Sequence, residues 1–366
     1  MISEQKVECM QCHKTKELLK ALAATVGPTG LLASDALVSR ATSVWNPKPM
    51  AALALIRPKS TAEVSAVLRL CHQASQDVVI VGGGTGPVAG AEPSSESIAI
   101  SLERMNRIED IDPVNASCVV QAGTCLQNVQ EAVAAYQLLF PLDLGARGSC
   151  TIGGNIATNA GGINVLRYGS MRGLVLGLEA VLPDGTVISS MGRLLKNNAG
   201  FDLKQLFIGT EGTLGVVTRA VLRLFPKQSA RQTAMIAFSS FEQVADFLQL
   251  AKLKLGATLS AFEAMWQSYI EEQLRFYQRR SPFMDRHAFY VLIETEGADE
   301  ELNKLALNET LELALGKGII ADAVVAKSDQ ERQRLWDLRE DLEPLSGTSH
   351  FSGMTLACRS GTCQPM

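Results

Sequence analysis

The fold of this chain is decided by the stretch GSCTIGGNIATNAGG, residues 148–162. Its glycines, alanines and short hydroxyl side chains let the backbone come close to a long ligand, while amide and hydroxyl groups supply hydrogen bonds at fixed places. The stretch therefore predicts one wall of an extended ligand site. The residues expected to form it are Gly148, Ser149, Cys150, Gly153, Gly154, Asn155, Thr158 and Asn159.

Two further glycine loops are found elsewhere in the sequence. The apolar run DVVIV leads directly into a loop in which four of five residues are glycine, so that backbone N–H groups can surround a phosphate. Alone, this loop would fit a simple turn equally well, since it lacks the lysine of a P-loop and the GxGxxG spacing of a Rossmann fold. A third stretch, GTEGTLGVV at residues 209–217, again joins glycines to a strand. Two separated anion-binding loops suit a dinucleotide, and the residues concerned are Gly82, Gly83, Gly84, Thr85, Gly86, Glu211, Gly212, Gly215 and Val217.

Composition indicates a globular protein with more than one domain. The 366 residues are 46% hydrophobic and 20% charged, and the net charge of −4 leaves no basic stripe for nucleic acid. No apolar run reaches the roughly 20 residues that a membrane span requires, so we expect no integral membrane segment. The first residues lack the pattern of a secretory signal, and the eight cysteines are typical of reduced thiols. These features predict a cytoplasmic protein.

The pattern of apolar residues predicts an α+β protein with four segments. Residues 1–50 form a helical segment, 51–227 a sheet domain with interspersed helices, 228–345 a domain of alternating strands and helices, and 346–366 an aberrant tail. The third segment predicts an antiparallel sheet with helices on one face, which would cap the first domain. Within it, Ser240 and Gln243 form a capping box at the start of a helix.

One cysteine pattern near the N-terminus has a known chemical use. Cys9, Cys12 and His13 spell CxxCH, the spacing that attaches c-type haem. No export signal and no small haem domain accompany it, so a haem carrier is a remote alternative to an exposed segment that leads into a helix. No second ligand pair lies at zinc-like spacing, and we expect no metal site.

Several motifs together resemble a known flavoprotein domain. GSCTIGGNIATNAGG, LRYGSMRG, DLKQLFIGTEGTLGVVT and LFPK are similar to the FAD-binding domain of D-lactate dehydrogenases, the glycolate oxidase FAD subunit and D-2-hydroxyglutarate dehydrogenase. The resemblance implies a two-lobed FAD-binding domain of the vanillyl-alcohol-oxidase/PCMH type, followed by an incomplete antiparallel-sheet cap domain. It also implies that the loops at 82–86 and 149–159 hold the FAD pyrophosphate and flank the isoalloxazine, while residues 211–217 meet the adenosine or ribityl part. Neither of the first two loops contains histidine, so FAD is expected to be held non-covalently.

The resemblance further implies oxidation of a D-2-hydroxyacid such as D-lactate, glycolate or D-2-hydroxyglutarate, by hydride transfer to flavin. The electrons would pass to a quinone, a cytochrome or an electron-transfer flavoprotein. Arg339, in LWDLRED, matches the arginine that binds the substrate carboxylate in the family, although a solvated surface arginine fits the same helix. Glu343 stands where the D-2-hydroxyglutarate branch has threonine, and a carboxylate there would repel a dicarboxylate substrate.

The chain departs from the family at its end. The family's histidine-rich stretch, His-x-Gly-Asp-Gly-Asn-x-His, is not in this sequence, whose four histidines are His13, His72, His287 and His350. The tail FSGMTLACRSGTCQPM can be written in codons that, in another frame, encode FRYDVSLPIRDMPAY, which resembles the strand expected there. These observations lead to the hypothesis of a frameshift near Phe351. The catalytic residues are then unknown, and the alternative function is an inactive FAD-binding remnant.

Overall fold

The computed structural model of the chain describes residues 4–341. The chain forms two compact units. Among the described residues, the first unit contains residues 4–161 and 169–227, and the second contains residues 162–168 and 228–341. Residues 162–168 lie between two stretches of the first unit in the sequence, but they pack with the second unit.

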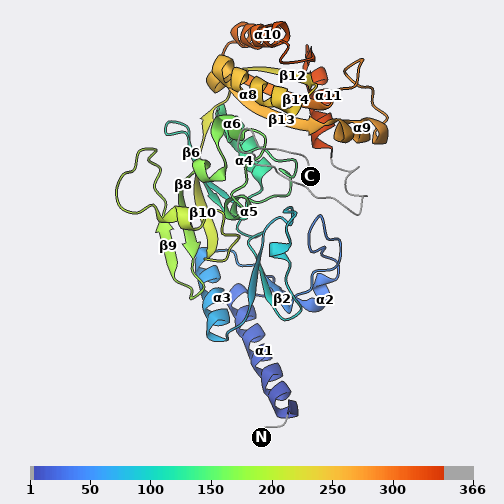
Figure 1. The fold of residues 1–366 in the computed structure, drawn as a ribbon. Coiled ribbons are helices and arrows are strands. Elements are labelled where there is room, and N and C mark those ends of the chain that lie inside the picture. Colours follow the sequence, from blue (N-terminus) through green and yellow to red (C-terminus); the bar gives the residue numbers. More distant parts are fainter. Residues whose placement is uncertain (1–3, 342–366) are drawn as a thin grey trace. The chain divides into compact units, whose positions relative to one another are not determined.

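The first unit begins with a small mixed sheet covered on both faces. Parallel pairs join β4 to β2 and to β3, and β1 pairs with β2 in the antiparallel sense. Helices α1 and α3 pack on one face through Leu22, Val26, Val64 and Val67, whereas Leu37 of α2 packs on the other (Figure 1). The bounds are β1 Leu31–Ala33, β2 Ala54–Ile56, β3 Val78–Val81, β4 Ile98–Ser101, α1 Glu4–Val26, α2 Ser34–Leu37 and α3 Thr61–Gln73.

The second lobe of the first unit is a five-stranded antiparallel sheet in the order β5-β6-β10-β8-β9. Its central strands β6, β10 and β8 are almost entirely buried. Strands β8 and β9 form a hairpin, and the turn between them contains Pro183, Asp184 and Gly185, residues typical of tight turns. The bounds of its strands are β5 Ile108–Asp112, β6 Ser117–Gln121, β8 Val175–Val181, β9 Val187–Ser190 and β10 Val216–Arg223. Further elements are α4 Leu126–Ala134, α5 Ile152–Ala157, α7 Met171–Leu174, η1 Ala89–Ala91, η2 Leu203–Leu206, and the paired β7 Leu138–Leu139 and β11 Phe225–Pro226.

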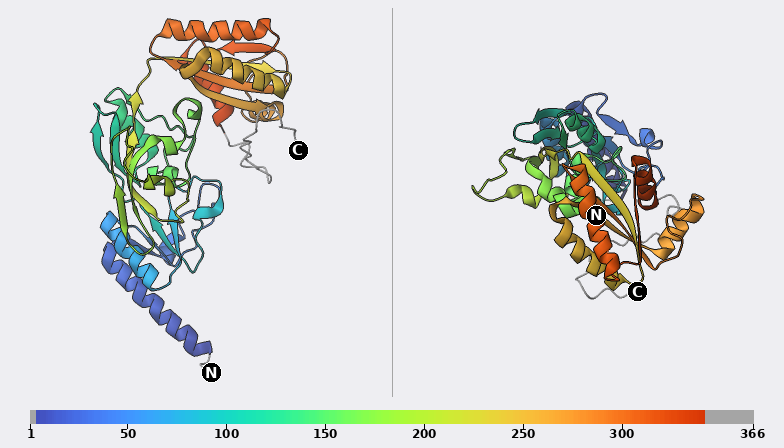
Figure 2. Two further views of the ribbon diagram at one scale, coloured as in Figure 1. Left: turned by 60° about the vertical axis from the view of Figure 1, so that its left-hand side comes forward. Right: turned by 90° about the horizontal axis from the view of Figure 1, so that it is seen from above.

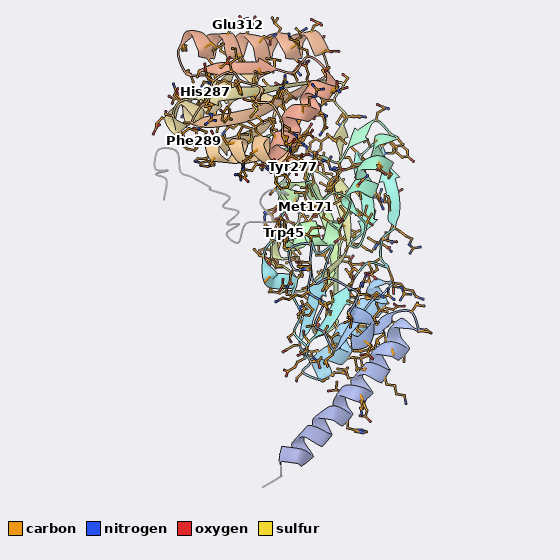
Figure 3. All side chains as sticks on the ribbon, turned by 90° about the vertical axis from the view of Figure 1, so that its right-hand side faces the viewer. Trp45, Met171, Tyr277, His287, Phe289 and Glu312 are labelled. Carbon is orange, nitrogen blue, oxygen red and sulfur yellow. The ribbon has the colours of Figure 1, made fainter. Side chains whose placement is uncertain are left out.

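The second unit is built on a four-stranded antiparallel sheet in the order β13-β14-β12-β15. Figure 2 shows α8 and α10 lying along this sheet. The loop that carries His287 leads into β14, which begins at Phe289 (Figure 3). The bounds are β12 Ala230–Phe238, β13 Leu259–Trp266, β14 Phe289–Gly297, β15 Asp322–Val325, α6 Val165–Tyr168, α8 Phe241–Leu255, α9 Gln267–Phe276, α10 Glu300–Gly316, α11 Asp329–Glu340 and η3 Gly256–Thr258.

Helices cover both faces of this sheet, so the expectation of helices on one face is wrong. Ala234 and Ile236 of β12 pack with α8 and α10 on one face, whereas Met235 and Ala237 pack with α9 and α11 on the other. Successive side chains of a strand point to opposite faces. Both sets are fully buried. The strand is apolar at consecutive positions, so each of its two faces contributes to a hydrophobic core.

Most elements expected from the sequence are confirmed. The capping box of Ser240 and Gln243 is present at the start of α8. In the sequence, the segments that form α3, α4, α8, α10 and α11 carry apolar residues at helical spacing, which predicts helices there. The helix expected after the CxxCH pattern begins earlier, at Glu4, so that it includes the pattern. The tail 346–366, Glu343, His350 and the frame change near Phe351 lie outside the described residues.

Candidate cofactor and substrate sites

The loop at Gly82–Gly86 follows β3 and touches the second glycine loop. A side chain on Gly83 is sterically excluded, because a Cβ there would lie 2.1 Å from the carbonyl oxygen of Ser149 and 2.9 Å from Cα of Cys150. The two loops, more than sixty residues apart in sequence, are therefore in backbone contact. Only glycine at position 83 permits this approach.

The orientation of this first loop is fixed through its carbonyl groups. The N–H of Val44 donates to the Gly84 carbonyl oxygen at 2.9 Å, and the indole Nε1 of Trp45 donates to the Thr85 carbonyl oxygen at 3.1 Å. The amide N–H groups of residues 83–86 make no hydrogen bond within the part of the chain that the structure describes. Amides that are not engaged within the protein can donate to a phosphate without first breaking other hydrogen bonds.

The second loop continues into the short helix α5. Thr151 is its N-cap, and the Thr151 hydroxyl accepts a hydrogen bond from the Gly154 N–H. The Gly153 N–H donates to the Ala122 carbonyl oxygen at 2.6 Å, which ties the loop to the end of β6. Thr158 lies at the other end of α5, where its hydroxyl donates to the Gly154 carbonyl oxygen. Ser149 and Gly148 are exposed beside the first loop.

Cys150 and Asn155 lie beneath this loop and not on its surface. Cys150 is 3% exposed and Asn155 is 4% exposed, and the Asn155 amide nitrogen lies 3.6 Å from the Cys150 sulfur. Burial raises the pKa of the Cys150 thiol, so it stays protonated near neutral pH. The structure thus directs both side chains into the protein, where they support the loop from below.

The third loop is attached to the C-terminal end of α5. The N–H of Gly209 donates to the Ile156 carbonyl oxygen at 3.1 Å, and the N–H of Glu211 donates to the Ala157 carbonyl oxygen at 2.8 Å. Asn159, which has a φ of 49°, accepts a hydrogen bond from the Arg172 N–H through its side-chain oxygen. The structure therefore brings all three glycine loops of the sequence together around α5.

A cavity of about 500 Å³ lies beside the third loop. Its walls combine apolar groups, such as Ile80 and Val216, with polar groups, such as Gln76 and Asp77. Gly212 and Gly215 line it, whereas Val217 is buried in the strand that follows, and the Glu211 side chain is exposed. A mixed cavity of this size next to an anion-binding loop could hold the base and sugar of a nucleotide.

FAD fits the residues present in the first unit. The amides of residues 83–86 suit a diphosphate, and the contact between Gly83 and Ser149 lets one diphosphate meet two loops. Among the described histidines, His72 lies on α3, His13 on α1 and His287 in the second unit, so none belongs to a glycine loop. His13 is exposed and pairs with Glu17, and residues 4–341 contain no group of histidine, cysteine or carboxylate side chains arranged to hold a metal ion.

Arg339, the candidate for binding a substrate carboxylate, lies in the last turn of α11 in the second unit. Its Nε and Nη2 atoms each lie 2.8 Å from Oε2 of Glu263 on β13. Its side chain is 35% exposed, so it is neither a fully solvated surface arginine nor a buried one. Glu263 was not expected from the sequence, in which it stands 76 positions away.

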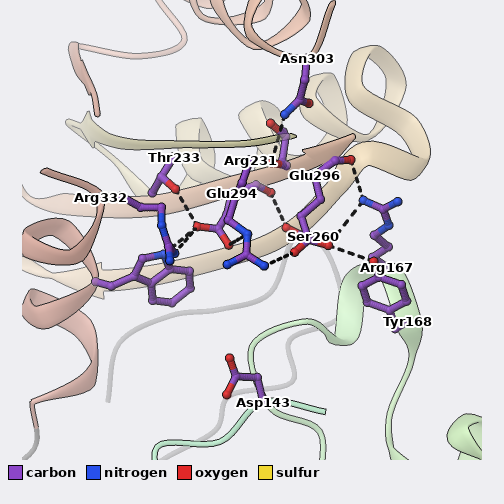
Figure 4. A network of polar contacts seen from close by, with 12 residues as sticks. Asp143, Arg167, Tyr168, Arg231, Thr233, Ser260, Glu294, Glu296, Asn303 and Arg332 are labelled. Atoms are coloured by element: carbon purple, nitrogen blue, oxygen red, sulfur yellow. Dashed lines mark hydrogen bonds and ion pairs between the residues drawn. The ribbon is translucent and has the colours of Figure 1, made fainter. Parts of the chain in front are cut away.

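The same face of α11 takes part in a second ionic network, drawn in Figure 4. Glu294 of β14 accepts hydrogen bonds from Thr233, Arg332 and the Trp336 indole, at 2.6, 3.1 and 2.8 Å. Although Glu294 is only 3% exposed, the three donors and the nearby Arg231 guanidinium compensate its charge. The sequence contained a signal for this network, because two glutamates stand two positions apart in an otherwise apolar strand.

Glu296, two residues along β14, connects the sheet to the segment 162–168. It accepts hydrogen bonds from the Tyr168 hydroxyl at 2.9 Å and from Arg231 at 2.7 Å, and Arg167 donates to its main-chain carbonyl oxygen (Figure 4). Burial, together with the adjacent Glu296 carboxylate, raises the pKa of Tyr168 well above its usual range. The Tyr168 hydroxyl is therefore a permanent donor.

Comparison with known families finds two matches along the chain. The family described as FAD binding domain matches residues 52–190, and that described as FAD linked oxidases, C-terminal domain, matches residues 227–356. Among solved structures, p-cresol methylhydroxylase with bound substrate aligns with a TM-score of 0.71 at 16% identity, covering 88% of this chain and 68% of that one. An alkyldihydroxyacetonephosphate synthase aligns with a TM-score of 0.69 at 20% identity, covering 89% and 64%. At these low identities, the structural likeness shows that this chain shares the fold of these proteins.

Curated proteins are more similar in sequence. D-2-hydroxyglutarate dehydrogenase of Bos taurus mitochondria is 42% identical over 286 residues, which are 78% of this chain and 52% of that protein. The Arabidopsis thaliana mitochondrial D-2-hydroxyglutarate dehydrogenase is 40% identical over 289 residues, or 79% and 52%. A D-2-hydroxyglutarate–pyruvate transhydrogenase of Saccharomyces cerevisiae is 38% identical over 301 residues, or 82% and 60%. The aligned part of this chain thus spans little more than half the length of these relatives.

These relatives contradict one expectation from the sequence. Both dehydrogenases are named as mitochondrial proteins, so the expectation of a cytoplasmic location is wrong. That expectation was based on the first residues of the chain, whereas the names of both relatives place those proteins in mitochondria. A separate finding concerns membranes: no helix within residues 4–341 is both long enough and apolar enough to cross a bilayer.

Proposed function

The chain belongs to the FAD-linked oxidoreductases that include the D-2-hydroxyglutarate dehydrogenases, and on this premise we propose that it oxidises a D-2-hydroxyacid with non-covalently bound FAD. The observation that carries the proposal is the convergence of three glycine loops around α5, with the amides of residues 83–86 available to an anion. The names of the relatives support a small hydroxyacid as substrate and mitochondria as the site of action.

Each loop has its own task in this proposal. The amides of Gly83 to Gly86 would hold the diphosphate, and residues 149–159 would flank the flavin ring. Residues 211–217 and the adjoining cavity receive the adenosine part. FAD, when bound, supplies the acceptor for the hydride that leaves the hydroxyl-bearing carbon.

The hydroxyacid is oriented by Arg339 in this proposal. A guanidinium presents its N–H groups along two edges, and the edge formed by Nε and Nη2 is bound by Glu263. The Nη1 side has no hydrogen bond within residues 4–341 and can receive a carboxylate in the bidentate manner that arginine favours. The base that removes the hydroxyl proton is not assigned, and the electron acceptor stays open between quinone, cytochrome and electron-transfer flavoprotein.

The test is anaerobic reduction of the FAD-loaded protein. D-lactate, glycolate and D-2-hydroxyglutarate are added in turn, with L-lactate as the matched control, and loss of the visible flavin absorbance is followed. We expect one D-hydroxyacid to bleach the flavin, and Arg339→Ala to slow that bleaching by on the order of a hundredfold or more. Properly folded protein that stays colourless with excess FAD would overturn the proposal. A yellow protein that no hydroxyacid bleaches would favour the alternative, FAD binding without turnover.

A further inference from the structure

The contact between Arg339 and Glu263 leaves the guanidinium in one defined orientation. Nε and Nη2 both lie 2.8 Å from the same carboxylate oxygen, Oε2 of Glu263, so one edge of the plane faces β13. The Arg339 side chain is 35% exposed, and its Nη1 atom, on the remaining edge, makes no hydrogen bond within residues 4–341. A single arginine thus has one edge bound to the protein and another edge open.

The main chain of Arg339 is fixed as well. The last four carbonyl groups of a helix have no partner within that helix. At the end of α11, side chains of α9 and the residues after it supply the donors. The Tyr269 hydroxyl donates to the Arg339 carbonyl oxygen at 2.9 Å, Gln273 donates to that of Asp341 at 2.5 Å, and Arg279 donates to that of Asp337 at 3.1 Å.

The rotation of α11 about its axis is set by a third group of contacts. Arg332, Trp336 and Arg339 follow the spacing of one helical face, and the first two donate to Glu294 on β14 (Figure 4). Because β13 and β14 are paired along their length, Glu263 and Glu294 belong to one rigid sheet. This face of α11 is therefore fixed against the sheet at two places, by Arg332 and Trp336 on β14 and by Arg339 on β13.

We propose that Glu263 is a positioning residue that holds Arg339 by one edge so that the other edge receives the carboxylate of the hydroxyacid. Its negative charge also lowers the affinity of the site for that anion, because it neutralises part of the guanidinium charge. The inference rests on the proposed function, in that it takes Arg339 as the group that binds the substrate. It adds a second residue, on another element, that sets both the geometry and the strength of that binding.

The two roles of Glu263 can be separated by substitution. Glu263→Gln keeps an oxygen acceptor for Nε and Nη2 but removes the charge, so the orientation persists while the anion is bound more tightly. Like charges near a protein surface repel each other only moderately, because solvent screens them, so we expect a dissociation constant lower by about threefold to tenfold. Glu263→Ala removes the same charge and the acceptor as well. We expect the lost orientation to outweigh the gain from the removed charge, so that the freed guanidinium binds the anion about tenfold more weakly than the unsubstituted protein does.

The experiment is isothermal titration of the full-length FAD-loaded protein with 2-oxoglutarate and, separately, with pyruvate, the oxidised products, which carry the same carboxylate and cannot reduce the oxidised flavin. It reports binding and needs no turnover. Thermal unfolding of each variant is measured in parallel, so that loss of folding is recognised. The matched control is Glu272→Gln, which removes a carboxylate bound to Arg275 at 2.7 Å on the exposed surface of α9 and should leave binding unchanged.

Opposite shifts for Glu263→Gln and Glu263→Ala would support the inference. Equal shifts for the two variants, or no shift in either, would overturn it, provided that Arg339→Ala abolishes binding. If Arg339→Ala binds as tightly as the unsubstituted protein, the role of Arg339 in the proposed function fails, and the inference fails with it. Should Glu263→Ala not fold, an unchanged dissociation constant in Glu263→Gln alone is enough to reject the inference.

Discussion

The α-carbon of Gly83 faces the carbonyl oxygen of Ser149 so closely that a methyl group on it would lie 2.1 Å from that oxygen. This approach joins two loops that the sequence separates, and it aligns both with the amides proposed to bind a diphosphate. The contact is between backbone atoms, so no side chain can move aside to relieve it. Residue 83 is consequently the position at which the cofactor site is most easily disrupted.

We predict that Gly83→Ala lowers the affinity for FAD by on the order of tenfold to a hundredfold, because the loops must separate and hydrogen bonds to a charged group are lost. The matched control is Gly192→Ala, outside the three glycine loops. Its added methyl would meet no atom within 4 Å, and its backbone conformation is open to other residues. Bound flavin per protein, measured by absorbance after gel filtration, compares the two. Equal flavin content in both variants would count against the loop contact.

Asn159 combines a left-handed backbone conformation with a side-chain hydrogen bond, and two substitutions distinguish them. Asn159→Gly keeps the conformation, whose φ is 49°, but loses the bond from the Arg172 N–H. Asn159→Ala loses the bond and adds backbone strain of about 1 kcal/mol. We therefore expect Asn159→Ala to unfold with a free energy about 1 kcal/mol lower than Asn159→Gly, measured by urea denaturation. Indistinguishable midpoints would mean that the conformation is not strained.

The buried carboxylate of Glu294 should matter for stability. Glu294→Gln leaves Arg332 and Arg231 without their shared counter-charge in the interior of the second unit. Because both guanidiniums are partly exposed, we expect a loss of about 2 kcal/mol, less than the 3 to 5 kcal/mol typical of a fully buried pair.

The matched control for Glu294 is Glu312→Gln, on the exposed side of α10 (Figure 3), which should change the free energy of unfolding by less than about 0.5 kcal/mol. Denaturation of the second unit is followed by the fluorescence of Trp336, whose indole donates to Glu294. A Glu294→Gln protein as stable as the Glu312→Gln protein would show that the network contributes little.

Stability at alkaline pH should depend on Cys71. Burial raises the pKa of this thiol to about 11, whereas an unfolded cysteine titrates near 9.0. Because the folded pKa is the higher one, the thiol contributes stability that is fully present below pH 9 and is lost as the pH rises toward 11. The loss should amount to about 2 kcal/mol over that interval.

The comparison for Cys71 is Cys71→Ala, which has no proton to lose at this position. Its free energy of unfolding should be lower at pH 8, because a buried group is removed, but should fall less steeply between pH 9 and pH 11. Urea denaturation at several pH values measures both slopes. Parallel slopes for the two proteins would show that another group governs the alkaline transition.

Local structure and the positions of the glycine loops could be predicted from the sequence alone. A capping box such as that of Ser240 and Gln243, or a Pro-Asp-Gly turn, acts within a few residues, so its signal is contained in the sequence. The same holds for Gly84, whose φ of 65° favours glycine locally, whereas Gly83 is required by the contact with Ser149, which the sequence does not reveal. The apolar positions at helical spacing likewise predicted α3, α8 and α10.

What those elements face could be seen only in the folded chain. The partner of Arg339 is Glu263, on another element, and that pairing depends on strand register and on which helix covers which face of the sheet. For the same reason, the burial of Cys150 and Asn155 could not be predicted from the sequence, since the direction of a side chain in a turn depends on what the turn packs against. Interactions between neighbours along the chain are encoded in local sequence, whereas charges and packing across the fold depend on distances that only the folded chain sets.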